Sequence, residues 1–347
     1  MLRNWCRKIG LWSRRALLPA LIVMLEAPVV LAGPEGGTVV GGAATISRPD
    51  AATTIINQAS HNVAIDWDKF NIGANERVQF AQPGRSASAL NRIFDQNPSR
   101  ILGRLDANGR VVLLNPNGVF FGPNARVNVG ALTAAGAKLG DDQLQAFLDS
   151  GRLKLQALDA TDGLVVNQGL IEAATGGSVT LAGKAVRNEG VIIASAGRVS
   201  LVAGSAMTLD FDGDGLMRFA IDEGVLKNAH ALDEAVANSG SITADGGEVL
   251  ISAATARDVF DRAINNSGVV KAARIERSGG RIRLVGGGAG SSVLNTGTLS
   301  ATGAGDTDGG SIHVLGDHVA LGAGSVVDAS GDAGGGEVLV GGDYQGA

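Results

Sequence analysis

The chain has 347 residues, a formal net charge of −5 and 52 glycines. Hydrophobic residues make up 45% of the sequence and aromatic residues only 4%, so small aliphatic side chains must form the core. This composition favours short strands joined by tight turns. It argues against a compact enzyme with an aromatic-lined pocket.

Residues 1–32 have the pattern of a secretory signal peptide, with cleavage after Ala32. A mostly apolar stretch from 16 to 31 follows the basic residues Arg3, Arg7, Lys8, Arg14 and Arg15. The alternative, a membrane anchor, is disfavoured because the stretch is too short and too broken to span a bilayer. Ser13-Arg14-Arg15 partly resembles a twin-arginine signal. We expect the Sec machinery to be the inner-membrane route, with the twin-arginine route as the alternative.

Removal of this segment changes the chemistry of the mature chain. The only cysteine, Cys6, lies inside it, so no disulfide, thiol nucleophile or cysteine-ligated metal is expected afterwards. The remaining 24 basic and 33 acidic residues give a formal charge of −9. A secreted chain this acidic is not expected to bind nucleic acid.

The second half of the sequence repeats one pattern. An Asn-x-Gly tripeptide opens each of five units, at Asn167, Asn188, Asn238, Asn266 and Asn295. A short strand, a glycine turn and a second strand of alternating apolar and polar residues follow, as in Val179/Leu181 and Val199/Leu201. Repeats of 20–30 residues with strands and no helix indicate a β-solenoid. The alternative, a β-sandwich, does not need the same order of turns five times.

In a solenoid, like residues lie above like. The inward valine, isoleucine and leucine side chains then form an aliphatic column, and the five asparagines are expected to form a ladder of side-chain amides. Two segments break the rhythm. Residues 140–152 have helical spacing and predict a short helix or turn. Residues 206–237 predict an excursion from one coil, and its end, 228–237, could be a short helix.

The first third of the sequence carries motifs that differ from these repeats. Phe70-Asn71-Ile72-Gly73 comes first, Asn97-Pro98 follows, and Val111 to Leu114 runs into Asn115-Pro116-Asn117-Gly118. Asparagine, proline and glycine at these places are the residues that a type I turn favours. Taken alone, the last motif indicates a well-formed turn between two strands.

The order of these motifs resembles the amino-terminal secretion domain of filamentous haemagglutinin and related two-partner-secretion (TPS) exoproteins. The resemblance covers residues 33–205 and extends through the repeats. One departure is Asn-Pro-Ser-Arg at 97–100, where some members have a second Asn-Pro-Asn. The resemblance assigns a secretion motif to Asn71, Ile72, Gly73, Asn97, Pro98, Asn115, Pro116, Asn117 and Gly118.

The resemblance implies an all-β fold, a right-handed parallel β-helix with short excursions. It divides the chain into a signal peptide (1–32), a secretion domain with an amino-terminal cap (33–205), an excursion (206–237) and further β-helix repeats (238–347). It also implies export. An outer-membrane transporter of the TpsB/Omp85 type, with POTRA domains, would recognise the unfolded chain in the periplasm. The chain would then fold at the cell surface or be released, with no stable membrane span.

Few residues suggest chemistry. No two of the histidines (61, 230, 313 and 318) have the helical spacing of a zinc site. The stretch from Asp210 to Gly215 resembles the start of a calcium loop, but Ile221 stands where an EF-hand needs glutamate. A looser calcium turn stays open. We predict no catalytic residue, no resident metal and no cofactor.

Three functions remain from these patterns. The first is a surface adhesin that binds a host or bacterial receptor and contributes to virulence. The second is a haem- or haemopexin-binding exoprotein of the same family, with the excursion at 206–237 as its ligand loop. The third and least favoured is a β-helical polysaccharide enzyme using Asp210, Asp212 and Asp214. The sequence stops just after a strand with no polar capping coil, so we expect it to be the front of a longer protein or a truncated gene.

Overall fold

The computed structural model describes residues 33–139, 142–157, 161, 163–211, 217–228, 231–275 and 278–341. The predicted signal peptide lies outside the described residues. So do His230 and the side chains of the predicted calcium turn.

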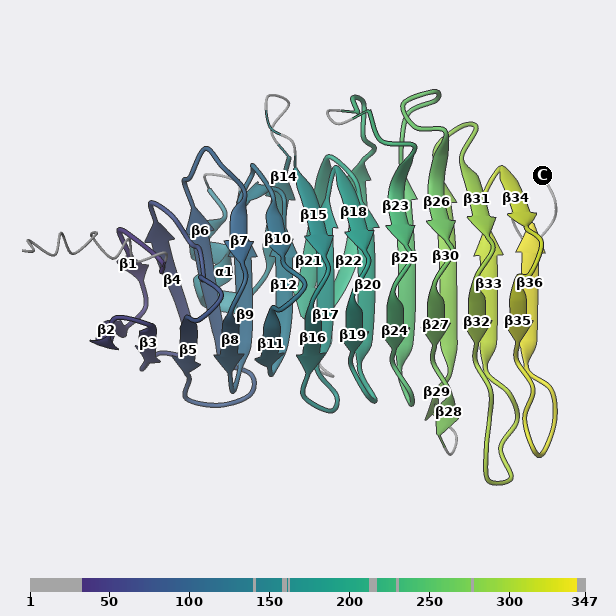
Figure 1. Ribbon diagram of the computed structural model, residues 1–347, viewed down its shortest axis with the longest axis horizontal. Helices are drawn as coiled ribbons and strands as arrows, with labels where there is room; N and C mark the ends of the chain where they lie inside the picture. Colours follow the sequence, from purple (N-terminus) through teal and green to yellow (C-terminus); the bar gives the residue numbers. More distant parts are fainter. Residues whose placement is uncertain are drawn as a thin grey trace, which may run out of the picture. The chain divides into compact units, whose positions relative to one another are not determined.

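Three long sheets form the walls of the described part (Figure 1). The first sheet consists of β1 (Thr38–Gly41), β4 (Asn62–Trp67), β6 (Ser88–Ile93), β9 (Arg110–Leu114), β12 (Ala131–Ala135), β17 (Ser178–Gly183), β20 (Arg198–Ala203), β25 (Glu248–Ala254), β30 (Arg281–Gly287), β33 (Ser311–Leu315) and β36 (Glu337–Gly341). The second consists of β7 (Ser99–Ile101), β10 (Val119–Phe121), β15 (Leu164–Asn167), β18 (Ala185–Asn188), β23 (Glu234–Asn238), β26 (Arg262–Asn266), β31 (Ser292–Asn295) and β34 (His318–Leu321).

The third sheet consists of β2 (Ala44–Asp50), β3 (Thr53–Gln58), β5 (Arg77–Ala81), β8 (Arg104–Ala107), β11 (Arg126–Val129), β16 (Leu170–Ala173), β19 (Val191–Ile193), β24 (Ser241–Thr243), β27 (Val269–Lys271), β32 (Thr298–Ser300) and β35 (Val326–Asp328). A complete coil passes through the first, second and third sheets in turn, as in β9, β10 and β11, before β12 returns to pair in parallel with β9. The predicted right-handed parallel β-helix is confirmed.

The Asn-x-Gly tripeptides mark the corner between the second and third sheets. Each asparagine ends a strand of the second sheet, and the strand after the glycine belongs to the third. The second strand of each predicted repeat is present and belongs to the first sheet. The strands before each asparagine, which make up the second sheet, were not predicted.

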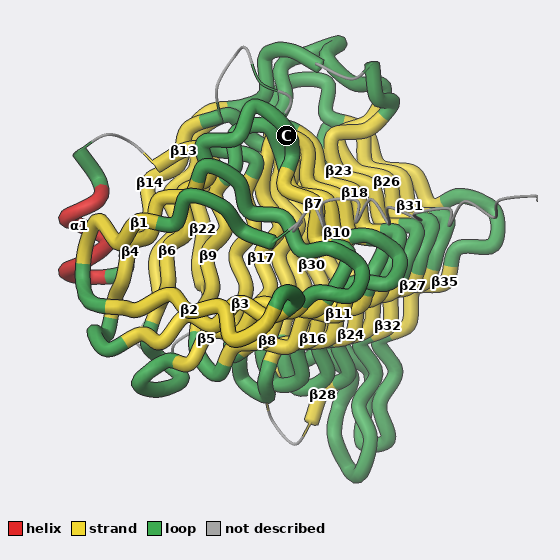
Figure 2. The backbone as a smooth tube through the Cα atoms, turned by 60° about the vertical axis from the view of Figure 1, so that its left-hand side comes forward, coloured by secondary structure: helices red, strands yellow, loops and turns green. Residues whose placement is uncertain are grey.

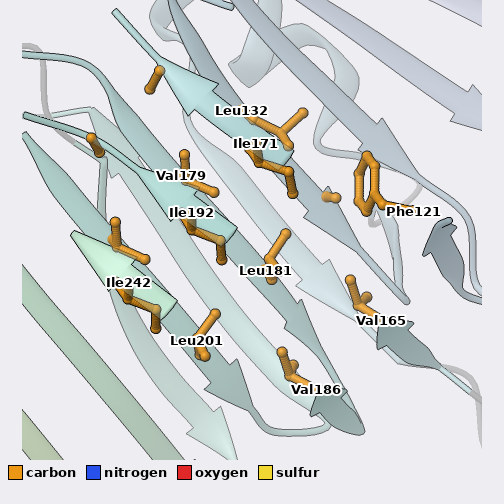
Figure 3. Close-up of a cluster of buried hydrophobic side chains, with 14 of the residues drawn as sticks. Phe121, Leu132, Val165, Ile171, Val179, Leu181, Val186, Ile192, Leu201 and Ile242 are labelled. Carbon is orange, nitrogen blue, oxygen red and sulfur yellow. The ribbon is translucent and has the colours of Figure 1, made fainter. Parts of the chain in front are cut away.

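Aliphatic side chains from all three sheets fill the interior (Figure 3). Val179 and Val199 pair in register in the first sheet, and Val165 and Val186 do so in the second. All four side chains are fully buried. Identical spacing in successive coils therefore produces the predicted aliphatic column.

A second core lies on the outer face of the first sheet. A four-stranded antiparallel sheet covers it, made of β13 (Lys138–Leu139), β14 (Leu153–Gln156), β21 (Ala206–Phe211) and β22 (Met217–Glu223). With α1 (Leu144–Ser150), these strands lie along one side of the coils (Figure 2). The buried side chains of this core come from both layers: Ala64, Leu90, Val112, Leu114, Ala135, Ala137, Leu139, Phe147, Leu153, Leu155, Ala182, Val202, Met207 and Leu209.

The helix predictions for the two irregular segments had different outcomes. Helix α1 confirms the short helix predicted within 140–152. The helix predicted within 228–237 is wrong, because Glu234–Asn238 forms β23 and buries Ala235 and Val236 in the main core. A small hairpin of β28 (Arg274–Ile275) and β29 (Ser278–Gly279) projects from a later coil. No helix among the described residues is both long and apolar enough to cross a bilayer.

The amino-terminal end of the coils is closed by antiparallel strands. β1 pairs antiparallel with β4, and β2 pairs antiparallel with β3. Below them, Trp67 and Phe70 are buried and pack edge-to-face with ring centroids 5.3 Å apart. Trp67 Nε1 donates a hydrogen bond to the buried Asn91 Oδ1 at 2.9 Å. The cap therefore covers the edge that the first parallel coil would expose.

The glycines at the coil corners allow the backbones to approach closely. A Cβ added at Gly240 would lie 2.1 Å from the carbonyl oxygen of Gly190 in the preceding coil. At a second corner, a Cβ on Gly247 would lie 2.0 Å from the oxygen of Gly197. Since backbone atoms cannot move aside as a flexible side chain can, any larger residue must separate the coils.

We predict that Gly240→Ala lowers the free energy of unfolding by about 1–3 kcal/mol, because the added methyl group overpacks a coil corner. Thermal or urea unfolding of the purified chain measures this. Gly84→Ala is the matched control, since nothing lies within 4 Å of its Cβ position. Equal stability of the two variants would contradict the close-packing argument.

Candidate recognition segment and asparagine column

The turn from Asn115 to Gly118 joins β9 to β10. The amide of Gly118 donates to the carbonyl oxygen of Asn115 at 2.8 Å, which closes the predicted turn. Asn115 Oδ1 accepts the amide hydrogen of Asn117 at 2.9 Å. The Asn115 side chain is fully buried. The local sequence accounts for the turn, and packing against the preceding coil accounts for the burial of Asn115.

Asn115 ties this turn to the preceding coil. Its Nδ2 donates to the carbonyl oxygen of Asn97 and to Ser99 Oγ, both at 3.0 Å. Asn117 Nδ2 donates to the carbonyl oxygen of Asp95 at 2.8 Å. The two proposed motif segments, 97–98 and 115–118, therefore lie against each other in adjacent coils.

Asn71 lies one coil before the Asn97–Pro98 segment, beside the strand that follows it. Its Oδ1 accepts the amide hydrogen of Arg100 at 2.8 Å. Ile72 is fully buried and forms a parallel bridge with Ile101. A Cβ on Gly103, one coil later, would lie 2.2 Å from the oxygen of Gly73. The structure thus stacks the three motif segments in successive coils, although they are far apart in the sequence.

The motif residues differ in accessibility. Asn97 and Pro98 are exposed, Asn71 and Asn117 are both half-buried, and Asn115 is inaccessible. Asn97, Pro98 and Asn117 line a surface cleft of about 430 Å³ that also includes Phe120 and Val166. The Arg100 guanidinium lies over the Phe120 ring, 5.3 Å from its centroid.

The five repeat asparagines form a buried hydrogen-bonded column. Nδ2 of each donates to Oδ1 of the next: Asn167 to Asn188 at 2.8 Å, Asn188 to Asn238 at 2.7 Å, Asn238 to Asn266 at 2.7 Å and Asn266 to Asn295 at 2.6 Å. Asn295 Nδ2 donates to the carbonyl oxygen of Gly297 at 3.2 Å. Phe121 occupies the same register position one coil before Asn167, so the column begins where the aromatic core ends.

The outer face of the second sheet carries a half-buried ion network beyond the cleft. Arg187 Nη2 lies 3.4 Å from a Glu234 carboxylate oxygen, and Arg262 lies 2.8 Å from the other. Burial lowers the pKa of the Arg187 guanidinium, and the charge of Glu234 acts in the opposite direction. The network stabilises adjacent coils and offers no nucleophile.

Metal and catalytic candidates do not converge in the described part of the chain. No group of three or more histidine, cysteine, aspartate or glutamate side chains there could hold a metal ion. His313 Nε2 lies 3.5 Å from Glu337, on the outer face of the first sheet. This is a contact between side chains of neighbouring strands.

Comparison with known proteins identifies the family. The model of the TPS secretion domain matches residues 32–301. The chain belongs to the TPS secretion domain family. The crystal structure of the HMW1 secretion domain from Haemophilus influenzae shares 31% sequence identity with it, with a TM-score of 0.77 over 90% of this chain and 78% of that one. The family resemblance inferred from the motifs is confirmed.

Two curated relatives of this TPS domain are heme/hemopexin-binding proteins of Haemophilus influenzae. One is 33% identical over 214 residues, which cover 60% of this chain and 23% of the relative. The other is 43% identical over 101 residues, which cover 29% and 11%. The chain therefore spans less than a quarter of the length of either relative. The family match continues past residue 205, and the division of the chain at 205 and 237 stays a prediction.

We predict that Asn238→Leu strongly destabilises the TPS domain. It removes the acceptor of Asn188 Nδ2 and the donor to Asn266 Oδ1. Two buried polar groups without partners cost roughly 2–6 kcal/mol. Urea unfolding followed by circular dichroism measures the loss. Ser239→Ala, at the exposed neighbouring position, is the control, and a similar loss in both variants would refute the role of the column.

Proposed function

We propose that this chain is a secreted or surface-exposed filamentous-haemagglutinin-like adhesin, and that its TPS domain directs export. In this proposal the Sec machinery carries it across the inner membrane by means of residues 1–32. A TpsB/Omp85-type transporter then binds it through periplasmic POTRA domains and passes it outward. Family membership over residues 32–301 is the observation that carries the proposal.

The burial of the motif supports recognition before folding. Asn115 is fully buried, and its amide group is already bonded to the preceding coil. Asn71 is likewise engaged, with the amide of Arg100. A transporter that reads these side chains has to meet them in the unfolded chain, because the folded coil leaves no face of Asn115 accessible. After folding, Asn97 and Pro98 are exposed, and Asn71, Gly73, Pro116 and Asn117 are partly exposed.

Folding outside the cell offers a driving force for export. Each added coil buries the open face of the coil before it, and the coils from Asn167 to Asn295 also join their asparagine amides into the column. The free energy of stacking is therefore released stepwise as the chain emerges. A folded coil is also too wide to slip back, so folding gives the movement its direction without ATP.

A second candidate function follows from the relatives named heme/hemopexin-binding proteins. The excursion at 206–237 was the segment expected to supply a ligand loop. In the described part of this segment, Met207 and Leu209 pack into the second core. That packing gives 206–211 a structural role and leaves less of the segment available for a ligand.

We further propose that the chain is not an enzyme. The TPS family comprises secretion domains of exoproteins, and a β-helix alone does not imply polysaccharide cleavage. Binding of haemopexin by the purified chain would favour the second candidate function. Degradation of a sugar polymer would favour an enzyme.

We predict that export depends on the transporter and on the motif. The full chain with its own signal, expressed in a Gram-negative host, should reach the medium only when the cognate transporter is present. Asn115→Ala and Asn117→Ala should each reduce release several-fold, because the recognised segment is altered. Immunoblots of medium and periplasm measure the distribution.

Two controls separate recognition from stability. Asn124→Ala changes an exposed asparagine in another turn and should export normally. Gly240→Ala weakens a coil corner far from the motif, so it reports the effect of reduced stability alone. Release without the transporter would contradict the proposal, and so would equal release of the motif variants and Asn124→Ala.

A further inference from the structure

One band of the chain is basic although the whole chain is acidic. Residues 77–126 contain seven arginines, no lysine and two aspartates, so their formal charge is +5, against −5 for the full sequence. These residues form the coils from β5 to β11. The basic arginines are Arg77, Arg85, Arg92, Arg100, Arg104, Arg110 and Arg126.

Three of these arginines form a row on the outer face of the third sheet. Arg77, Arg104 and Arg126 stand in direct register on β5, β8 and β11. Neighbouring strands lie about 4.8 Å apart, so the three side chains rise from closely spaced points. The row ends on both sides, because Thr53 precedes it and Leu170 follows it in the same register.

Such a row costs stability in the isolated protein. Like charges directly opposite each other on paired strands are destabilising. The side chains of Arg77 and Arg104 are 44% and 62% exposed, and Arg126 is also exposed. The three arginine side chains point into solvent and make no contribution to the core. Any favourable interaction that offsets their repulsion therefore has to come from the solvent side.

One carboxylate orients the row without neutralising it. Asp106 accepts a hydrogen bond from Arg77 Nε at 2.6 Å and lies 3.6 Å from Arg104 Nη2. Asp106 therefore contacts two of the three arginines, and the exposed Glu172, in register with Asn128 on the next strand, adds a second carboxylate to this face. The next outward register position carries Gln79, Asp106 and Asn128, so amides and a carboxylate lie beside the guanidinium groups.

Two arginines of the row, Arg77 and Arg104, border an open hollow of about 560 Å³, and Arg126 follows them in register on β11. The lining of the hollow includes Arg77, Gln79, Arg104, Asp106, Asn108 and Asn128. Guanidinium groups bind carboxylate or sulfate with paired, charge-assisted hydrogen bonds. The amides of Gln79 and Asn128 suit hydroxyl groups, which both donate and accept. The hollow therefore combines anion recognition with recognition of hydroxyls.

The chemistry of the hollow favours a sugar polymer over a nucleic acid. Proteins that bind single-stranded nucleic acid stack its bases on aromatic side chains. The one aromatic residue in this lining, Phe80, is 1% exposed and belongs to the core. We propose that the arginine row binds an acidic polysaccharide, whose sulfate or carboxylate groups lie among hydroxyls. The proposal rests on the adhesive role proposed above and names its receptor class.

Binding of the purified, folded full chain to dextran sulfate and to hyaluronate tests this inference. The triple variant Arg77→Gln/Arg104→Gln/Arg126→Gln should lose about tenfold or more in affinity for the preferred polymer, since a lost charged hydrogen bond costs about one such factor. Arg104→Lys should bind with intermediate affinity, because it keeps the charge and loses the paired geometry. The polymer bound more tightly distinguishes sulfate from carboxylate.

Lys271→Gln is the matched control, because it removes one exposed positive charge from a third-sheet strand outside the row. It should bind like the unaltered chain. The triple variant should melt at the same temperature as the unaltered chain or higher, because it removes the repulsion between the stacked arginines. Unchanged binding by the triple variant overturns the inference. So does equally tight binding of a single-stranded DNA of matched charge. The assay needs no transporter, so its failure is distinguishable from failure of the export proposal.

Discussion

Every coil of this protein has to lie directly on the one before it at the spacing of hydrogen-bonded strands. This constraint decides which residues the corners accept. Where the backbones meet most closely, as at Gly190 and Gly240, only glycine leaves room. Where an amide side chain turns inward, it has to find a hydrogen-bond partner in a neighbouring coil. The column from Asn167 to Asn295 satisfies that requirement with one residue type in five coils.

The same constraint explains why the protein tolerates irregular segments in only a few places. An excursion has to leave at a corner and return in register. The segment between β20 and β23 does so, since Asn188 and Asn238 pair across it despite being 50 positions apart. Its described strands then join β14 and cover the outer face of the first sheet. The excursion adds a second core without disturbing the first.

The sequence could predict the features that recur locally. The Asn-x-Gly tripeptides and the alternating strands after them identified the corners and the first and third sheets. The second sheet escaped detection because its strands are short and end in the same asparagine that begins the visible motif, as in Leu164–Asn167. Ser178 and Thr180 alternate as solvent-facing residues do, yet both are buried beneath the second core. That burial depends on the pairing of β14 with β21, which are distant in the sequence, a contact that no local pattern encodes.

The secretion motif shows how one segment can serve two states of the chain. In the unfolded chain, the asparagine and proline side chains of 115–118 are open to a partner. In the folded chain, Asn115 bonds to the preceding coil and disappears from the surface. Folding therefore hides Asn115, one of the residues that the transporter is proposed to recognise, and a folded chain offers only the motif side chains that stay exposed, such as Asn97 and Pro98. The largest buried side chains, Trp67, Phe70, Phe80, Phe121 and Phe147, also lie in this early part. Burial of aromatic side chains provides the most apolar area per residue, so the part of the chain that carries the motif has the strongest tendency to fold and to hide Asn115.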